Sequence, residues 1–530
     1  MATIRMPAEH DASPGEPPAA GLAQRSLGAL KWNYLGTLAK VGSQFIIGIL
    51  LARLLGPEPF GVVAIAWLLL GLGNLVADFG LAAALIQKPQ VSSRDIRHVF
   101  TLQMLAGIAL TLVTLVAAPS IATFFGHAEV TPVLRWMSLV FVIQSFGQTA
   151  TALLRRNLDH KRVQVLQVAS YLAAYLLLGV PLAFSGAGVW ALVVAQLTQA
   201  GLCSLAAYLS VRHSVLPALT ADQSGLFGFG SKVLISNLTS WGYSSLDSAI
   251  VGRMLGVVEL GLYNRSLNLV ASPMNAAVST LQGVLFPLYS RLQGRPEQAR
   301  RVFLASVCLL SAVLMPVFAA VAAIPDTVIL AVYGQHWQSA IGLATPLALA
   351  MPVYAVLALG GPMMLGLGRA GMEAAAQGFG VLVLGVATFV AAQNSLADVA
   401  WAVLAVYLLR AILVTRLAMG LVSVDVSSLG RALAGPMLLG ALTALFAGYA
   451  NHLLADALPR PFIRLGADIV LAGTFVTATL LLLGRWIFCT EARSVLQQAR
   501  SHLPPALNSL MAHWCGTCPD TSRRSMSGEG

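Results

Sequence analysis

Charged side chains are scarce in this sequence. Lys, Arg, Asp and Glu make up 10% of the 530 residues, whereas hydrophobic residues make up 57% and the mean hydropathy is +0.78. Soluble domains carry about 25% charged residues, so this chain cannot cover itself with a water-facing surface. In a soluble protein the net charge of +11 would suggest a nucleic-acid partner. Here the placement of the charges matters more than their sum, and we expect no nucleic-acid partner.

Cysteines and metal ligands are also few. The five cysteines are Cys203, Cys308, Cys489, Cys515 and Cys518. At least two lie in apolar segments, which argues against a disulfide framework. Cys515 and Cys518 have thioredoxin-like spacing but no preceding strand, and with His502 and His513 they do not form a usual zinc set. We expect no metal and no cofactor other than a coupling cation or proton, and the role of this tail is open.

Signal-peptide features and long loops are missing as well. The first 25 residues lack a basic start, a short apolar core and a cleavage site. We predict a disordered cytoplasmic tail over residues 1–27 and insertion through the first apolar segment. The loops between apolar segments are short and present no cluster of acids, bases or metal ligands. A membrane enzyme would be expected to present such groups, so we predict a protein without catalytic residues.

Apolar segments of about twenty residues are abundant. Each is long enough to cross a hydrocarbon core of about 30 Å as a helix. We predict an all-α integral membrane protein with fourteen transmembrane helices. Their approximate positions are 31–54, 60–86, 98–124, 133–154, 163–184, 187–210, 226–252, 257–289, 301–323, 340–366, 372–392, 396–418, 431–451 and 465–488.

Basic residues are distributed unevenly between the two sides of these segments. With the N-terminus in the cytoplasm, 24 of the 32 Lys and Arg fall on the cytoplasmic side, 5 on the opposite side and 3 within helices. Because cytoplasmic loops carry the excess of Lys and Arg, both termini are predicted to be cytoplasmic. One basic loop contains Arg155, Arg156, Lys161 and Arg162. We interpret it as a contact for anionic lipid, with capture of a substrate phosphate as the alternative.

One turn occurs twice. Arg53, Gly56 and Gly61 follow the first apolar segment, and Arg253, Gly256 and Gly261 follow the seventh, 200 residues later. We call these six residues the twin turn. A second echo pairs Val189–Ala195 with Ala400–Val406. Two six-helix units of like orientation are therefore predicted, at 28–212 and 213–420, followed by two further helices in 421–490 and a cytoplasmic tail at 491–530. Because both units carry the twin turn, we interpret it as a hinge or anchor.

Two stretches resemble a known family. They run from Arg53 to Gly61 and on to Gln87, and from Asn237 to Asp247 and on to Arg265. These stretches are similar to the polysaccharide transporter (PST) family, the Wzx-type lipid-linked oligosaccharide flippases that serve as lipopolysaccharide or exopolysaccharide exporters. The MOP superfamily to which they belong also holds the MATE multidrug exporters and the lipid II flippases. The resemblance covers about residues 28–420.

The resemblance implies a fold and a function. Two pseudo-symmetric six-helix bundles would form a V around a central cavity. By alternating access, an undecaprenyl-diphosphate-linked oligosaccharide would cross the bacterial inner membrane for capsule, exopolysaccharide or O-antigen synthesis. The implied partners are this substrate, membrane lipids, and the polymerase and other proteins of polysaccharide assembly, with the transporter itself a monomer. The glycan, the coupling ion and the polymerase are left open.

Four charged residues are predicted at membrane depth, where a charge needs a partner or a watery cavity: Lys40, Asp78, Asp247 and Arg265. None has a charged counterpart 200 residues away. We predict that Lys40 and Arg265 line the cavity and bind the diphosphate. Alternatively, Arg265 neutralises Asp247 while Lys40 extends to the interface. Asp78 and Asp247 are candidates for a coupling site; otherwise Asp247 forms an ion pair and Asp78 is a helix-end residue.

Two other functions are alternatives. A cation-coupled multidrug exporter of the MATE type would share the fold, although cations in the cavity disfavour a cationic drug. An integral-membrane glycan polymerase or ligase is the third candidate, and the short outer loops disfavour it.

Overall fold

The computed structural model describes residues 19–78, 80–88, 90–218 and 224–499, with side chains described from residue 35 and, after 218, from residue 237 to 498. Within these ranges the chain forms helices and no strand, which confirms the all-α prediction. Thirteen helices of the described part are long and apolar enough to cross a membrane. The helix predicted at 226–252 is α9 (Ser224–Met254), whose first side chains lie outside the described residues.

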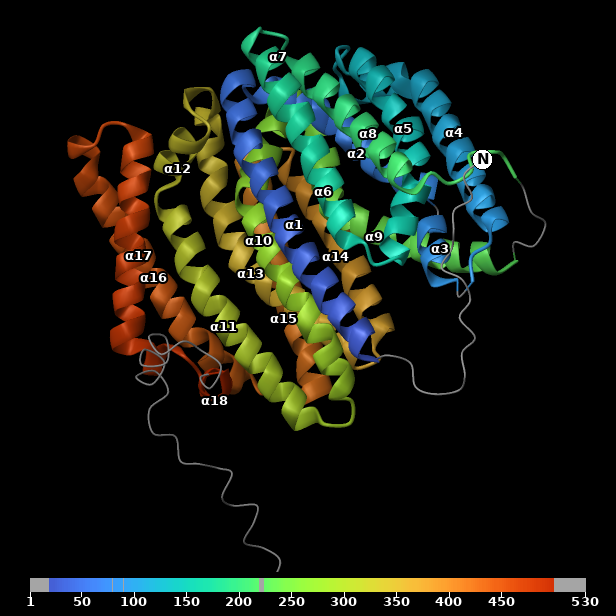
Figure 1. Cartoon of the computed structure of the whole chain (residues 1–530). Helices are drawn as coiled ribbons and strands as arrows, with labels where there is room; N and C mark the ends of the chain where they lie inside the picture. The colour runs from blue at the N-terminus through green and yellow to red at the C-terminus, as the bar shows by residue number, and fades with distance from the viewer. Residues whose placement is uncertain (1–18, 79, 89, 219–223, 500–530) are drawn as a thin grey trace, which may run out of the picture.

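The first half of the chain forms one bundle (Figure 1). Its elements are α1 (Ala19–Leu55), α2 (Pro57–Asp78), α3 (Leu81–Gln87), α4 (Ser93–Phe125), α5 (Val130–Arg156), α6 (His160–Tyr171), the π-helix η1 (Leu172–Gly179), α7 (Val180–Phe184) and α8 (Val189–Val211). The central helix is α5, which packs against α2, α4 and α8. It buries Val133, Leu134, Met137 and Phe141, whose spacing places them on one face.

The second half repeats this arrangement. After α9 come α10 (Val257–Arg291), α11 (Pro296–Ala323), α12 (Pro325–Val332), the 3₁₀-helix η2 (Gln335–Ala340), α13 (Ile341–Gly366), α14 (Ala370–Ala391) and α15 (Leu396–Val422). In this C-terminal bundle α9 packs against α14, just as α1 packs against α6 in the N-terminal bundle. The same pairing in both halves reflects the repeat seen in the sequence.

Three helices follow the repeat: α16 (Val426–Ala457), α17 (Pro461–Ile487) and α18 (Thr490–Ala499). Helix α16 packs along α11, and α17 packs on α16 and α12, at one edge of the molecule (Figure 1). Hydrogen bonds join this edge to the repeat, because Asn451 donates to Asp468 Oδ2 at 2.7 Å and to Thr327 Oγ1 at 2.8 Å. Thus α12, α16 and α17 are held together by one buried polar cluster.

The structure corrects several predicted boundaries. The helix predicted at 60–86 is two helices, since Gly80 adopts a left-handed φ of 71° between α2 and α3. Short helix α12 and η2 were not predicted; Pro325 starts α12, and Gly334 with φ 87° separates it from η2. Helix α1 begins at Ala19, inside the segment expected as a tail, while residues 1–18 and the pair Cys515 and Cys518 lie outside the described residues.

The two bundles meet where α2 crosses α10. A Cβ on Gly61 would overlap the carbonyl oxygen of Val257, and a Cβ on Gly261 would overlap the carbonyl oxygen of Pro57. Gly61 and Gly261 are therefore both needed for the two backbones to approach this closely. The crossing closes the end of the molecule at which the twin turn lies.

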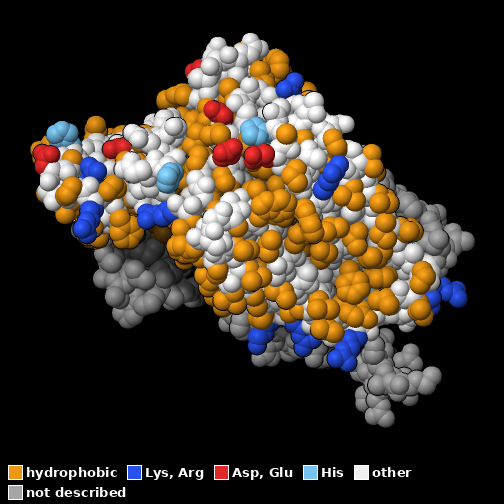
Figure 2. Space-filling view, turned by 90° about the horizontal axis from the view of Figure 1, so that it is seen from above, with side chains coloured by type: hydrophobic (Ala, Val, Ile, Leu, Met, Phe, Trp, Pro, Cys, Tyr) orange, Lys and Arg blue, Asp and Glu red, His pale blue; other side chains and the backbone are white. Residues whose placement is uncertain are grey.

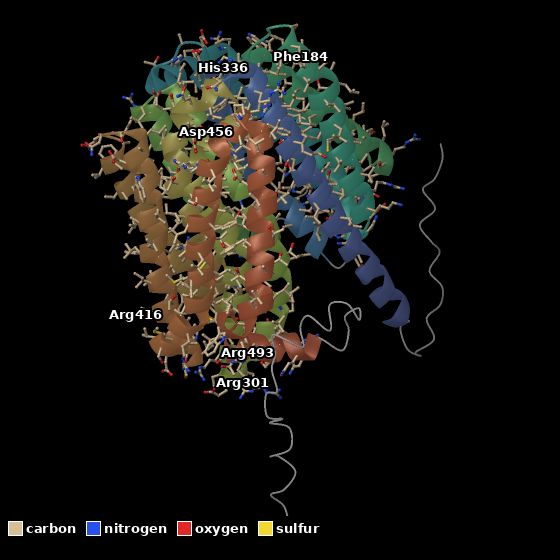
Figure 3. The ribbon with its side chains drawn as sticks, turned by 90° about the vertical axis from the view of Figure 1, so that its left-hand side faces the viewer. Phe184, Arg301, His336, Arg416, Asp456 and Arg493 are labelled. Atoms are coloured by element: carbon tan, nitrogen blue, oxygen red, sulfur yellow. The ribbon has the colours of Figure 1, made fainter. Side chains whose placement is uncertain are left out.

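The opposite end of the molecule is rich in arginine. Phe184, His336 and Asp456 lie at the twin-turn end, whereas Arg301, Arg416 and Arg493 lie at the other, which we call the basic end (Figure 3). Seen from above, the surface is broadly apolar with scattered charged side chains (Figure 2). Many large apolar side chains are exposed, including Leu445 at 72% and Leu482 at 74%. Large apolar side chains exposed on long helices, such as these two on α16 and α17, are what a lipid bilayer covers.

Candidate functional site

A cavity of about 600 Å³ lies between the two bundles, lined by residues of α1, α2, α6, η1, α8 and α10 and by Tyr333 after α12. We call it the interbundle cavity. Arg265 is the only charged residue among its described lining residues. Arg265 is eight residues beyond the start of α10, which at 1.5 Å per residue places it about 12 Å from the twin turn. This is membrane depth, so the guanidinium needs water or an anion beside it.

The guanidinium of Arg265 stacks on an aromatic ring, and its N–H groups form no hydrogen bond with the described residues. Its central carbon lies 3.8 Å from the centroid of the Phe60 ring. Tyr333 fixes the backbone by donating to the Arg265 carbonyl oxygen at 3.0 Å. Within the described part of the chain, no hydrogen bond from the guanidinium itself is present. A planar group stacked in this way presents its N–H donors to the cavity, which suits bidentate binding of a phosphate or carboxylate.

A second cavity, of about 370 Å³, lies within the N-terminal bundle. We call it the N-terminal cavity. Its charged lining residues are Lys40, Asp78 and Arg155. Lys40 Nζ donates to Gln167 Oε1 at 3.1 Å. Gln196 and Gln199 line both cavities, so the two cavities adjoin. We had expected Lys40 and Arg265 to line one cavity, but each lines a different one.

Asp78 is the last residue of α2 and faces the N-terminal cavity. Its Oδ1 accepts the backbone N–H of Ala82 at 3.2 Å and the amide of Gln103 at 3.1 Å. Gln103 in turn accepts from Thr149 Oγ1 at 2.6 Å. Asp78 thus lies at a helix end, where its carboxylate accepts a hydrogen bond from the first turn of α3 after the break. The same carboxylate remains at the wall of a cavity.

Asp247 and Arg265 do not form the ion pair that was offered as an alternative. Asp247 is buried and accepts the hydroxyl of Tyr263 at 2.6 Å and the backbone N–H of Ser248 at 2.7 Å. Arg265 instead stacks on Phe60. Tyr263 and Arg265 are both on α10 but point to different faces. Residues two positions apart differ by about 200° around the helix axis. Tyr263 lies on the face of α10 that points to Asp247, which is the face Arg265 would have to occupy to pair with Asp247.

The twin turn joins the bundles reciprocally. Arg53 of α1 donates to the carbonyl oxygens of Val332, at 2.6 Å, and Ala331, both at the end of α12. Arg253 of α9 lies over the ring of Phe124 at the end of α4, 5.0 Å from its centroid. Each arginine thus contacts the opposite bundle. The contacted residues Phe124 and Val332 each precede a glycine, Gly126 or Gly334, by two positions. Gly56 and Gly256, with φ of 73° and 102°, permit the turns themselves.

Sequence reasoning missed a set of amides. Asn74, Gln144, Gln148, Gln167, Gln196 and Gln199 all line the N-terminal cavity. The signal was present, because Gln144 and Gln148 are four residues apart and Gln196 and Gln199 three apart in apolar helices. Such spacings place both amides on one face.

Sequence reasoning also passed over Arg410, which had been counted only as a basic residue within a helix. It is buried in α15, with its guanidinium carbon 4.2 Å from the centroid of the Tyr243 ring. Tyr407 lies near both Tyr243 and Tyr354, at ring-centroid distances of 6.2 and 5.6 Å. Arg410 occupies the inside of the C-terminal bundle, surrounded by aromatic rings.

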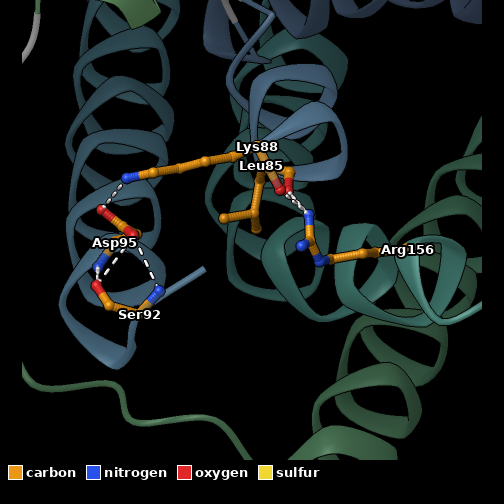
Figure 4. Close-up of polar contacts among 5 residues, drawn as sticks. All are labelled: Leu85, Lys88, Ser92, Asp95 and Arg156. Carbon is orange, nitrogen blue, oxygen red and sulfur yellow. Dashed lines mark hydrogen bonds and ion pairs between the residues drawn. The ribbon is translucent and has the colours of Figure 1, made fainter. Parts of the chain in front are cut away.

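The basic residues at the end of α5 have different surroundings. Figure 4 shows Arg156. Arg156 donates to the carbonyl oxygens of Leu85, Ile86 and Lys88 at 2.9, 3.1 and 2.6 Å, which satisfies the C-terminus of α3. Beside it Lys88 pairs with Asp95 at 2.8 Å. Arg155 instead lines the N-terminal cavity. Arg156 is therefore engaged within the protein, whereas Arg155 lies at the wall of the cavity that phosphate capture would use.

Residues 50–342 match the model of a family described as polysaccharide biosynthesis protein. The teichuronic acid biosynthesis protein TuaB of Bacillus subtilis is 24% identical over 72% of this chain and 79% of its own length. The lipopolysaccharide biosynthesis protein WzxC of Escherichia coli is 21% identical over 60% and 65%, and the succinoglycan biosynthesis transport protein ExoT of Rhizobium meliloti is 26% identical over 62% and 64%. This chain spans a little under two thirds of the last two.

Two solved structures show the same fold. The lipid II flippase MurJ, in an inward closed conformation, superposes with a TM-score of 0.66 at 12% identity and covers 86% of this chain and 99% of its own. An inward-facing MATE multidrug transporter of the MOP superfamily gives 0.58 at 17% identity, covering 73% and 94%. Together with the family match over more than half of the sequence, these likenesses confirm the resemblance: this chain is a multi-pass membrane protein that belongs to the polysaccharide biosynthesis protein family.

Proposed function

We propose that this chain flips an undecaprenyl-diphosphate-linked oligosaccharide across the bacterial inner membrane by alternating access. The observation that carries the proposal is Arg265, a cation at membrane depth whose N–H donors face the interbundle cavity. A diphosphate is costly to move through hydrocarbon unless its charge is neutralised, and a guanidinium in a watery cavity does this. The relatives named for teichuronic acid, lipopolysaccharide and succinoglycan biosynthesis support a glycan substrate.

The cations are staggered along the path that the substrate would follow. Arg155 lies at the end of α5 beside the basic end, Lys40 lies about 22 Å from the twin-turn end of α1, and Arg265 about 12 Å from that end of α10. A diphosphate entering beside Arg155 would meet Lys40 and then Arg265. Each transfer exchanges one charge-assisted contact for another, which keeps the anion neutralised throughout.

The charge distribution supports one orientation in the membrane. The excess of Lys and Arg supports a cytoplasmic basic end with both termini, and the twin-turn end would then face the periplasm. The crossing of α2 over α10 closes the periplasmic end in this conformation, so it represents an inward state. Opening to the periplasm requires Gly61 and Gly261 to separate and Arg53 to leave α12.

Asp78 is the carboxylate that we assign to coupling. It lines the N-terminal cavity together with Lys40 and Arg155, so a proton or cation on Asp78 would favour an anion bound in the same cavity. Asp247 is enclosed by Tyr263 and Ser248 and is the second candidate. Membrane lipids surround the protein, and the polymerase and other proteins of polysaccharide assembly are its proposed partners, with the transporter acting as a monomer.

Complementation of a deletion strain tests the proposal. Arg265→Gln and Lys40→Gln, at matched membrane abundance, are each expected to lower surface polymer at least about tenfold, because the removed cation is one charge-assisted contact to the diphosphate. Arg265→Lys should retain part of the output, since the charge remains without the fork geometry. Arg301→Gln, an exposed arginine at the basic end, is the matched control. Normal polymer in both Lys40 and Arg265 variants refutes the proposal.

The multidrug exporter is the second candidate, favoured by the MATE likeness. It predicts that the deletion strain accumulates a cationic dye while its surface polymer stays intact. The cations lining both cavities oppose such a substrate, because Lys40, Arg155 and Arg265 outnumber Asp78. Loss of polymer with unchanged dye efflux separates the two functions.

A further inference from the structure

The N-terminal cavity is lined mostly by neutral polar and small groups, and amides dominate. Six of its seventeen lining residues are Asn or Gln, contributed by α2, α5, α6 and α8. Gln144 and Gln148 stand one turn apart on α5, and Thr151 and Arg155 continue the same face towards the basic end. Membrane helices rarely carry so many polar side chains on one inner surface unless these line a watery path.

Four of these amides have unused hydrogen-bonding capacity. Lys40 binds Gln167 at 3.1 Å, and the hydroxyl of Tyr175 binds Gln196 at 2.8 Å. Within the described residues, Asn74, Gln144, Gln148 and Gln199 make no side-chain hydrogen bond. Each primary amide offers two donors and two acceptor lone pairs, and in an apolar surrounding these must be met by water or a ligand. The four amides therefore form a cavity wall that can hydrogen-bond to a polar ligand.

The amides are not a requirement of the repeated fold. Helix α13, the counterpart of α5, contains no Asn or Gln. At the offset set by Trp190 and Trp401, the counterparts of Gln196 and Gln199 are Tyr407 and Arg410. The C-terminal bundle thus forms the same helix packing without this surface, so the amides belong to the task of the N-terminal bundle alone.

We infer that the N-terminal cavity binds the sugar residues of the transported lipid through their uncharged hydroxyl groups, while Arg265 binds the diphosphate in the adjoining cavity. A hydroxyl is both donor and acceptor, and so is an amide, which allows the pair to meet in either direction. The volume of about 370 Å³ lies in the range of cavities that bind small molecules. Gln196 and Gln199, shared by the two cavities, stand where glycan and phosphate join.

Neutral amides also suit a carrier that must release its cargo. Hydrogen bonds between amides and hydroxyls replace similar bonds to water, so each has a modest net effect and many sugars are accepted with little penalty. This inference rests on the proposed function, because it assigns one part of the proposed substrate to one cavity.

The test compares two probes on purified full-length protein in lipid nanodiscs. One is undecaprenyl diphosphate without sugar, and the other is the lipid-linked glycan extracted from a strain lacking this transporter. For the double variant Gln144→Leu/Gln148→Leu we expect the dissociation constant for the glycosylated lipid to rise about tenfold. Its constant for the sugar-free lipid should stay within about twofold. Arg265→Gln should weaken both probes, because it removes the phosphate contact.

Two further variants control the test. Gln377→Leu removes an amide of α14 that binds Glu373 and lines neither cavity, and it should leave both constants unchanged. Gln148→Ala adds no bulk and should weaken only the glycosylated lipid, about threefold, even if the leucine variant folds poorly. Unchanged binding of the glycosylated lipid by both amide variants, with Arg265→Gln still weakening both probes, overturns the sugar site and leaves the proposed function standing. Failure of the native protein to bind either probe overturns both.

Discussion

The two halves of this protein share one helix packing but differ in what lies inside it. In the N-terminal bundle, Gln196 and Gln199 face a cavity that holds Lys40, Asp78 and four other amides. In the C-terminal bundle, the matched positions are Tyr407 and Arg410, which pack with Tyr243 and Tyr354. One half keeps an open polar space, and the other fills the corresponding place with aromatic rings around a single guanidinium.

This difference separates scaffold from transport. The features that the halves share are the twin turn and the crossing glycines, which join the bundles at one end. The features found in one half only are the cations and amides that line the cavities. A duplicated chain can retain its packing in both copies while each copy acquires its own polar groups, such as Lys40 in the first half and Arg265 in the second.

The largest effect is expected where the halves are most alike. Gly61→Val and Gly261→Val should each lower surface polymer at least about tenfold and destabilise the purified protein, because the new side chain meets a backbone carbonyl that cannot move aside. Overpacking costs about 1–3 kcal/mol, and contact with backbone places these variants at the upper end. Thermal unfolding in detergent measures it. Gly42→Ala on α1, which faces open space, is the control. A native melting temperature in the Gly61 variant would show that the crossing is not a tight contact.

Exchanging the matched residues should affect each half in a different way. Arg410→Gln removes a buried cation–π contact with Tyr243 and should destabilise the protein by about 2 kcal/mol. Gln199→Arg should leave the melting temperature nearly unchanged yet lower polymer output, because it adds a charge to a cavity wall. The two measurements are thermal unfolding and surface polymer at matched abundance. If Arg410→Gln lost transport without losing stability, the inside of the C-terminal bundle around Arg410 would contact substrate in addition to Arg265.

A smaller effect is expected at the twin turn. Arg53→Gln loses hydrogen bonds to the end of α12 and should destabilise the protein by about 1 kcal/mol. Arg253→Gln loses only a contact with the exposed ring of Phe124, worth about half as much. Chemical denaturation of both variants under the same conditions measures the difference. Equal losses would mean that the two arginines anchor the bundles equally, despite their different partners.

The smallest effect concerns the segment that joins the halves. His213 follows α8 and packs against the rings of Phe100 and Tyr208. Burial lowers the pKa of His213 from its ordinary value of 6.5, so the folded protein binds this proton less readily than the unfolded chain does. Stability is therefore full above pH 6.5 and falls as the pH drops towards the lowered pKa. His213→Phe should remove this part of the pH dependence, measured by melting temperature between about pH 8 and about pH 5. An unchanged profile would assign the dependence to other groups.

Much of the fold could be predicted because the membrane imposes it. Segments of about twenty apolar residues must become helices, since no water satisfies their backbone groups. The break at Gly80 could not be predicted with the same ease, because Phe79 and Leu81 continue the apolar pattern across it. Helix α12 was missed because Pro325 and Gly334 limit it to eight residues, too few to cross a bilayer.

The candidate site also contains residues that could be predicted from the sequence and residues that could not. Lys40, Asp78 and Arg265 were found because a charge in an apolar segment is conspicuous and costly. The amides were missed because a single Gln in such a segment is common, and their meaning appears only when four helices bring them to one wall. The pairing of Asp247 with Tyr263 was likewise hidden, because depth along a helix does not reveal which face a side chain occupies.

The sequence by itself determined that this chain lies in a membrane, that it is a duplicated design and that the twin turn is common to both halves. Composition and periodicity are sufficient for this, because the hydrophobic effect and the backbone's need for hydrogen bonds act on every segment alike. Only the tertiary structure decided which charges are satisfied and which face a cavity. The crossing at Gly61 and Gly261 sets the rotation of α2 and α10, and this rotation turns Tyr263 towards Asp247 while leaving the donors of Arg265 open.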